Sequence, residues 1–315
     1  MSDIMSDVLG LVDIPLEEFG VLGKDEYVSE VVNRPSVGYW KDAWRRLRKN
    51  KLAMIGLCII IIYTIMAIIG PWMTSFSYRT NYLMETNIRP NAQHWFGTDV
   101  LGRDLWARVW VGARISLFIG LVAALVQTFL GILIGGVAGY FGGNLDLVIM
   151  RIVDILSGIP FLIFVILIMM VIGSGLFPII ITFAITGWLG MARLVRGQVL
   201  QLKEQDFMTA AKAMGASSSR LILKHLIPNM SGVIIVTLTM RIPQAIFTEA
   251  FLSYIGLGVK PPMTSWGQLA NAGGQVMQVH PYQLLIPAFF ISTMMLALQL
   301  FGDGLRDALD PKLRK

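Results

Sequence analysis

Cysteine, histidine and charge are all scarce in this chain of 315 residues. Cys58 is the one cysteine, which excludes an internal disulfide and a cysteine-rich zinc site. The three histidines lie far apart, so the sequence has no local histidine pair for a metal ion. Charged residues make up 15% of the chain, against about 25% in an ordinary soluble domain. Hydrophobic residues make up 55%, and the two values together exclude a soluble enzyme and indicate an integral membrane protein.

Sequence motifs of nucleotide-binding and hydrolytic sites are missing as well. The chain has no G-x-x-x-x-G-K-[ST] pattern, so it does not hold ATP phosphates in that way, and it has neither H-E-x-x-H nor G-x-S-x-G. We therefore expect a chain that is not an enzyme, with no catalytic residue, no bound cofactor and no metal site. The net charge of +6 would suggest nucleic acid as the partner of a soluble protein. In a membrane protein it reports topology instead, and we expect no nucleic-acid partner.

Long runs without charge predict the fold class, an all-α integral membrane protein with six transmembrane helices. About 20 mostly apolar helical residues cross a bilayer core. The predicted spans cover approximately residues 52–73, 115–141, 152–172, 178–197, 229–256 and 281–303. They form one transmembrane domain over residues 38–315, preceded by an N-terminal arm over residues 1–37. This arm is acidic, since residues 1–33 hold eight acidic residues and one lysine.

Basic residues indicate how the spans face. Six spans put both termini on one side of the membrane, and 17 lysines and arginines flank or separate the spans on that side, against six on the other. Cytoplasmic loops carry an excess of lysine and arginine. We therefore expect both termini, and the loop over residues 198–228, to lie in the cytoplasm.

The 198–228 loop carries a pattern of two short helices. Asp206 is expected to cap a helix over Phe207–Met214, and Gly215 stands where a helix ends in the left-handed conformation. Ser217 or Ser218 offers a second N-cap, for a helix over 220–227 that stops at Pro228. The pattern predicts a compact knob on which another protein docks. An amphipathic segment lying on lipid head groups is the alternative.

Residues of this loop resemble a known motif. Thr209-Ala210-Ala211, Gly215 and Leu226-Ile227-Pro228 are similar to the EAA loop of ABC importer permeases. In that family the loop holds a coupling helix that docks on a cytoplasmic ATPase. Thr209 stands where the family has glutamate, which removes one polar contact. The resemblance implies that the residues that couple to the ATPase are Asp206, Phe207, Ala210, Ala211, Met214, Gly215, Ser217 and Arg220.

Further motifs in the same order resemble the C subunit of oligopeptide and dipeptide permeases. They cover residues 94–104, 112–117, 249–258, 265–267 and 302–311. The resemblance implies the type I permease fold of ABC importers, oligopeptides as the substrate, and a bacterial or archaeal cell membrane. It also implies a homologous permease subunit, two ATP-binding cassette subunits that hold ATP and Mg²⁺, and a periplasmic or extracellular peptide-binding protein.

Charged residues within or beside the spans are the remaining candidates for a site. Arg241 and Glu249 are expected to face either the translocation path or a neighbouring subunit, because an intramembrane charge is seldom exposed to lipid. On one helix they lie too far apart to pair unless Pro243 breaks it. Asp99, Arg103 and Asp104 form either a turn-stabilising cluster or a contact for the external receptor.

Glycines in the second span predict close helix packing. Gly131, Gly135 and Gly139 recur every four residues, a pattern that lets two membrane helices approach closely, and a role in gating is the alternative. An ATP-independent secondary transporter or channel is the alternative function. It would need ion ligands in several spans, which the charge-free runs do not offer. A membrane-embedded enzyme lacks clustered ligands or carboxylates, and a purely structural protein would not explain the series of motifs.

Overall fold

The computed structural model describes residues 38–310, so the predicted arm over residues 1–37 and the last five residues lie outside the described part. Within residues 38–310 the chain is almost entirely helical, with one isolated β-bridge between Thr98 and Asp104. The helices are α2 (Tyr39–Lys49), α3 (Lys51–Ile69), η2 (Gly70–Trp72), η3 (Leu83–Glu85), α4 (Leu105–Phe141), α5 (Gly143–Ser157), α6 (Phe161–Ile172), α7 (Leu176–Thr186), α8 (Leu189–Lys203), α9 (Asp206–Ala213), α10 (Ser218–Arg220), the π-helical turn η4 (Leu221–Leu226), α11 (Ile227–Asn229), α12 (Ser231–Tyr254), α13 (Trp266–Gln275) and α14 (Tyr282–Leu309).

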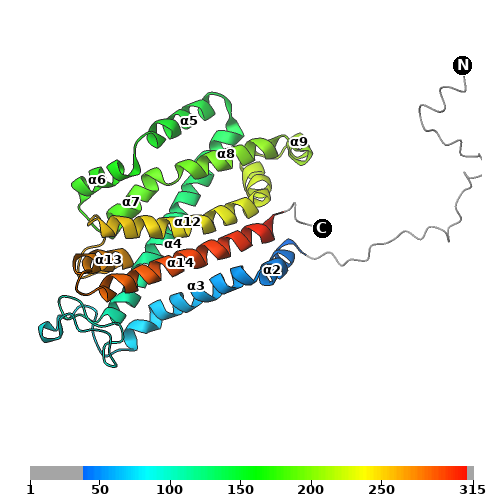
Figure 1. Ribbon diagram of the computed structural model, residues 1–315. Helices are drawn as coiled ribbons and strands as arrows, with labels where there is room; N and C mark the ends of the chain where they lie inside the picture. Colours follow the sequence, from blue (N-terminus) through cyan, green and yellow to red (C-terminus); the bar gives the residue numbers. More distant parts are fainter. Residues whose placement is uncertain (1–37, 311–315) are drawn as a thin grey trace, which may run out of the picture. The chain divides into compact units, whose positions relative to one another are not determined.

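Long helices run back and forth between two ends of the bundle (Figure 1). One end, here called the knob end, holds α2, α9 and the last turn of α14; the other, the loop end, holds residues 73–104 and α13. Five helical segments are long and apolar enough to cross a membrane. Counting the bent pair α5 and α6 as one span gives six. Residues 40–49 of α2 and residue 310 thus lie at the same end.

The second crossing begins earlier than the sequence predicts. Helix α4 starts at Leu105 instead of near residue 115, and the prediction stopped short because Arg108 and Arg114 interrupt the apolar run. Both arginines have partners: Arg114 donates to the carbonyl oxygens of Ala67 and Ile68, and Arg108 donates to the carbonyl oxygen of Tyr78. A helix tolerates charges inside a span when they are paired in this way.

The third crossing is not the straight helix over residues 152–172 that the charge-free run predicted. Helices α5 and α6 meet at an angle of 84°, with the break at residues 158–160. Pro160 explains the break, because proline lacks the backbone N–H that would continue the helix and restricts the residue before it. Helix α5 also starts at Gly143, nine residues before the predicted span.

Other prolines are accommodated within helices. Pro243 lies inside α12, which continues to Tyr254 without a break. Pro228, predicted to end the second knob helix, lies instead in the first turn of α11, where its missing N–H needs no partner. Only Met230 separates α11 from α12. The fourth crossing consists of α7 and α8, which together cover Leu176–Lys203. The sequence predicted one span over residues 178–197 here.

The glycine stripe of α4 forms a tight contact with α8. A Cβ atom added to Gly135 would lie 2.3 Å from the carbonyl oxygen of Ala192, and one added to Gly131 would lie 2.4 Å from Cβ of Met191. A Cβ atom added to Gly139 would lie 2.9 Å from the carbonyl oxygen of Arg196 and 2.9 Å from Cβ of Val199. This contact is the close helix packing that the spacing of the glycines predicted. In a membrane, where lipid tails compete with apolar side chains, such close contact is a main source of helix association.

Much of the outer surface of the bundle is apolar. Exposed side chains on α3, α4 and α6 include Ile62, Phe129 and Val171, the last with 87% of its surface exposed. Soluble proteins do not present such long apolar faces. These faces fit a lipid environment.

The glycine contact leads to a stability prediction. Replacing Gly135 by Ala inserts a methyl group where backbone atoms of α8 already lie, so we expect the free energy of unfolding to fall by about 1–3 kcal/mol. Thermal unfolding in mild detergent measures this. Gly136→Ala is the matched control, because a Cβ there meets nothing within 4 Å. Equal unfolding temperatures for the two variants would show that the contact does not hold α4 and α8 together.

Candidate functional site

A knob at residues 205–230 projects from the end of α8 (Figure 1). Helix α9 ends in a turn where Gly215 has φ of +76°, as the sequence predicted. Ser217 is the N-cap of α10, its hydroxyl accepting a bond from the backbone N–H of Arg220. The choice left open between Ser217 and Ser218 is therefore settled for Ser217. Asp206 was expected to be the cap of α9 but is its first helical residue, and Gln205 occupies the cap position without a side-chain bond.

Buried side chains attach the knob to the bundle. Met208, Ala211, Leu221 and Leu226 pack with residues of α8 such as Val195, and Ala211 is only 3% exposed. Ala211 was predicted to couple to an ATPase, and its burial against the bundle corrects that prediction. A helix of eight residues must bury one face to be stable, and these small and branched side chains form that face.

The opposite face of the knob is free within the described residues. Met214 is 82% exposed and Phe207 is 39% exposed. Asp206, Ala210, Gly215, Ser217 and Arg220 are exposed as well. Seven of the eight residues predicted to couple to an ATPase thus share an accessible surface that combines a large apolar side chain, small residues and one cation.

Helix α8 also holds α5 by two ion pairs. Arg196 donates to both carboxylate oxygens of Asp146, at 2.5 and 2.6 Å. Arg193 donates to Asp154 and to the hydroxyl of Ser157, each at 3.0 Å. The bidentate pair is the stronger, because two parallel bonds fix its geometry and Asp146 is buried. The partners Asp146 and Arg196 are far apart in the sequence, and no sequence pattern predicted their pairing.

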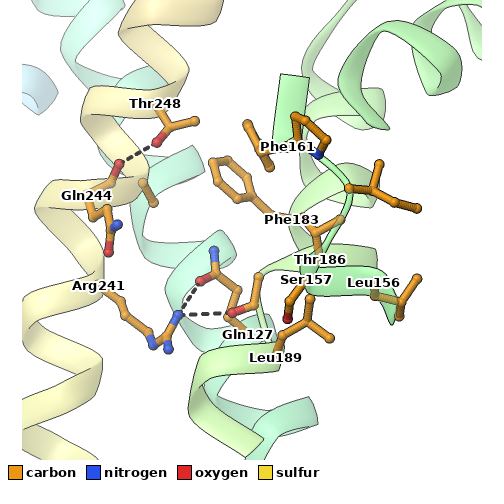
Figure 2. Close-up of a pocket in the computed structure, with 14 residues that line it drawn as sticks. Gln127, Leu156, Ser157, Phe161, Phe183, Thr186, Leu189, Arg241, Gln244 and Thr248 are labelled. Atoms are coloured by element: carbon orange, nitrogen blue, oxygen red, sulfur yellow. Dashed lines mark hydrogen bonds between the residues drawn. The ribbon is translucent and has the colours of Figure 1, made fainter. Parts of the chain in front are cut away.

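A cavity of about 570 Å³ lies where α4, α12, the α5–α6 break and the α7–α8 junction meet. Apolar side chains such as Phe161 and Phe183 form one wall (Figure 2). The polar residues of the lining are Gln127, Ser157, Thr186, Arg241, Gln244 and Thr248. Concave sites with a few polar groups on an apolar wall are typical of ligand sites.

Arg241 reaches across this cavity from α12 (Figure 2). Its Nη1 donates to Oε1 of Gln127 and to the carbonyl oxygen of Gly187, at 3.0 Å each. No acidic side chain lines the cavity, and no ion pair of Arg241 exists within the described part of the chain. Gln127 was the signal that sequence analysis overlooked, a lone amide in an otherwise apolar run.

Glu249 lies on the same helix but away from the cavity. It is fully buried and accepts bonds from the hydroxyls of Ser116 at 2.9 Å and Ser253 at 2.7 Å. Ser265 donates to Ser253, and the backbone N–H of Trp266 donates to Ser116, so the network joins α4, α12 and α13. The sequence offered Glu249 as a candidate for the path or for a neighbouring subunit; within residues 38–310 it has a structural environment instead.

Asp99, Arg103 and Asp104 form a turn at the loop end. Asp99 accepts hydrogen bonds from the backbone N–H and from Nε of Arg103. Asp104 caps α4 by accepting from the backbone N–H of Ala107, and its Oδ2 lies 2.9 Å from Nδ1 of His94. All three have exposed fractions of 9% or less. Their geometry is that of the turn-stabilising cluster, and their burial leaves little surface for the receptor contact that was the other expectation.

Comparison with protein-family models gives two separate matches. Residues 38–91 match the N-terminal transmembrane domain of oligopeptide transport permease C, and residues 131–315 match the binding-protein-dependent transport system inner membrane component. The second match covers more than half of the chain. The chain belongs to this family of transporter permeases.

Individual relatives of this permease cover nearly its whole length. It is 50% identical over 303 residues to a dipeptide transport system permease protein of Bacillus subtilis, and the alignment covers 96% of this chain and 95% of the relative. It is also 50% identical over 303 residues to an oligopeptide transport system permease protein of the same organism, spanning 96% and 99%. An inward-facing structure of the MetNI methionine ABC transporter aligns with 64% of the permease and 97% of that chain, at 20% identity and a TM-score of 0.49.

The family confirms the fold class read from the sequence, an all-α membrane protein with the permease fold of ABC importers. It does not favour the alternative of an ATP-independent secondary transporter or channel. The division at residue 37 and the assignment of individual site residues stay predictions.

The Glu249 network yields a second stability prediction. Glu249→Ala removes the acceptor of two buried hydroxyl groups, and each unpaired group costs about 1–3 kcal/mol. Glu249→Gln keeps the size and one carbonyl acceptor, and serine hydroxyls can rotate to accept from its amide. We expect thermal unfolding in detergent to show a large loss for Ala and a small one for Gln. Equal losses would mean that size alone matters at this position.

Proposed function

We propose that this permease imports peptides as one of two transmembrane subunits of an ATP-driven transporter. The two relatives with equal identity carry the words dipeptide and oligopeptide in their names, and peptides are the class that includes both. The motifs in the sequence resemble those of oligopeptide permeases, which favours the longer peptides. On this proposal the cavity beside Arg241 is the permease's part of the translocation path, and a homologous subunit provides the remainder.

The exposed face of the knob is the observation that carries the proposal. Phe207, Met214 and Arg220 are presented to solvent on a knob whose other face is buried against α8. An ATP-binding cassette subunit, holding ATP and Mg²⁺, would dock there and supply the energy that this chain cannot obtain through a phosphate-binding motif of its own. The knob end is then cytoplasmic, as the excess of basic residues near it supports.

Motion at the knob has a short route to the cavity. Helix α8 begins beside the cavity at Leu189 and ends at the knob, and its ion pairs to Asp146 and Asp154 connect it with α5. The break after α5 contributes Ser157, Ile159 and Pro160 to the cavity wall. A displacement of the knob would therefore move two walls of the cavity together.

The receptor is proposed to meet the loop end. Side chains exposed there include Leu83 and Met84, the latter 99% exposed, whereas the Asp99–Asp104 turn is covered. Contacts with a peptide-binding protein are more readily made by these exposed residues. The turn would hold the segment that presents them.

Isolation of the permease in mild detergent, followed by mass spectrometry, tests the composition of the complex. Co-isolation of a second permease and of ATPases, with ATP hydrolysis stimulated by the peptide-loaded receptor, is expected. Isolation of the chain alone from membranes that contain these proteins would contradict the proposal.

Gly215 offers the sharpest test of the knob. Gly215→Val puts a β-branched residue at φ of +76°, a conformation that L-residues other than Asn and Asp rarely adopt. We expect peptide uptake and receptor-stimulated ATP hydrolysis to fall about fivefold to thirtyfold, since the strain of about 1–2 kcal/mol favours another knob conformation. Membrane insertion should be unchanged.

Gly215→Asn is the matched variant, because asparagine tolerates positive φ. No neighbouring atom lies within 4 Å of a Cβ at this position, so steric contact does not complicate the comparison. Normal uptake by a well-expressed Gly215→Val variant would remove the elbow from the coupling route.

The ion pair between Asp146 and Arg196 tests the route from knob to cavity. Asp146→Arg or Arg196→Asp alone places like charges at the contact, and we expect each to reduce peptide uptake while ATPase subunits still bind. The double reversal restores opposite charges, so uptake should recover in part, and the double-mutant cycle measures the coupling. A double variant as defective as the worse single variant would argue against this pair as the link.

A further inference from the structure

Arg241 presents hydrogen-bonding capacity that no group in residues 38–310 uses. Its Nη1 has two partners, both neutral oxygens. Nε is covered from solvent and has no acceptor, and no bond is formed by Nη2. Native proteins seldom leave a buried donor of this kind unpaired, and a cationic donor is the most costly to leave so.

The unused donors share one edge of the guanidinium group. Nε–H and one N–H of Nη2 point in the same direction, which is the fork that binds the two oxygens of a carboxylate. The opposite side is held by Gln127 and Gly187, from α4 and the α7–α8 junction. The side chain is therefore positioned by two neutral groups. Of its unused donors Nε is covered from solvent, whereas Nη2 is not covered and has no acceptor, so Nη2 is the donor available to a solute.

The charge of Arg241 has no counter-ion in the described cavity. An unpaired cation at membrane depth is unfavourable, and such residues are normally paired or face a polar path. Arg241 is half-buried, so the cavity of about 570 Å³ gives a solute access to it. The remaining polar groups of the lining are neutral amides and hydroxyls, which do not select a particular side chain.

We infer that Arg241 binds a carboxylate of the passing peptide, and that this is chiefly the carboxylate at the peptide's C-terminus. This inference rests on the proposed function and adds a specific contact to it. Every linear peptide has that carboxylate whatever its sequence, whereas its side chains vary. One fixed cation among neutral groups suits a carrier of varied peptides, because it attracts the constant feature and the apolar wall at Phe161 and Phe183 accepts the variable ones.

The test compares three synthetic peptides in proteoliposomes that contain the full transporter and saturating receptor. One peptide has a free C-terminal carboxylate, the second is its C-terminal amide, and the third is the amide with one internal glutamate. Binding of each to the receptor is measured separately, so that uptake is compared at equal receptor occupancy. The peptide probes distinguish a terminal carboxylate from one on a side chain.

For the unaltered permease we expect faster uptake of the free acid than of the amide. Arg241→Gln should reduce uptake of the free acid about tenfold to one hundredfold and leave that of the amide nearly unchanged, so the preference disappears. Arg241→Lys should keep part of the preference, because it retains the charge but lacks the fork. Arg89→Gln removes an exposed arginine outside the cavity and should leave the preference intact.

Each other outcome has a definite meaning. Equal reduction of acid and amide uptake in Arg241→Gln would overturn the inference and give Arg241 a purely structural role between α4, α7 and α12. Restored uptake of the glutamate-containing amide to the level of the free acid would assign the site to carboxylates in general. Absence of ATP-dependent uptake of all three peptides by the unaltered transporter would instead contradict the proposed function.

Discussion

Close packing of α4 against α8 is the contact on which the rest of the permease depends. The glycines of α4 bring the two helix backbones together, and the carbonyl oxygen of Ala192 occupies space that any larger residue at Gly135 would need. Helix α8 in turn supports the buried face of the knob, holds α5 by ion pairs and contributes Leu189 to the cavity. A displacement of this one helix therefore reaches the knob and the cavity wall together.

Two intramembrane charges on one helix have different environments for a physical reason. Glu249 is surrounded by hydroxyl groups that turn its buried position into a junction of three helices. Arg241, about two turns away, is held by neutral oxygens and faces a cavity. Both carboxylate oxygens of Glu249 accept hydrogen bonds from the same chain, whereas only Nη1 of Arg241 has hydrogen-bond partners. That difference separates a structural group from a candidate ligand-binding group.

Sequence patterns were most informative where one physical constraint acts over a long segment. Charge-free runs located the crossings, because every residue in a span is subject to the same apolar solvent. The span predicted over residues 152–172 did not include the break that Pro160 causes, since the pattern of charge does not register it. The start of α4 was predicted too late because backbone carbonyl oxygens of distant segments accept hydrogen bonds from Arg108 and Arg114, which lets the helix include them.

The sequence by itself determined the class of protein, the long apolar helices, the left-handed turn at Gly215 and the cap at one of two serines. These depend on composition and on interactions between residues close in the chain. Only the tertiary structure decided that Ala211 is buried, that Asp146 pairs with Arg196 and that Arg241 faces a cavity while Glu249 does not. Those outcomes depend on which helix faces which, and in an apolar solvent lipid-facing and buried side chains are of the same kinds.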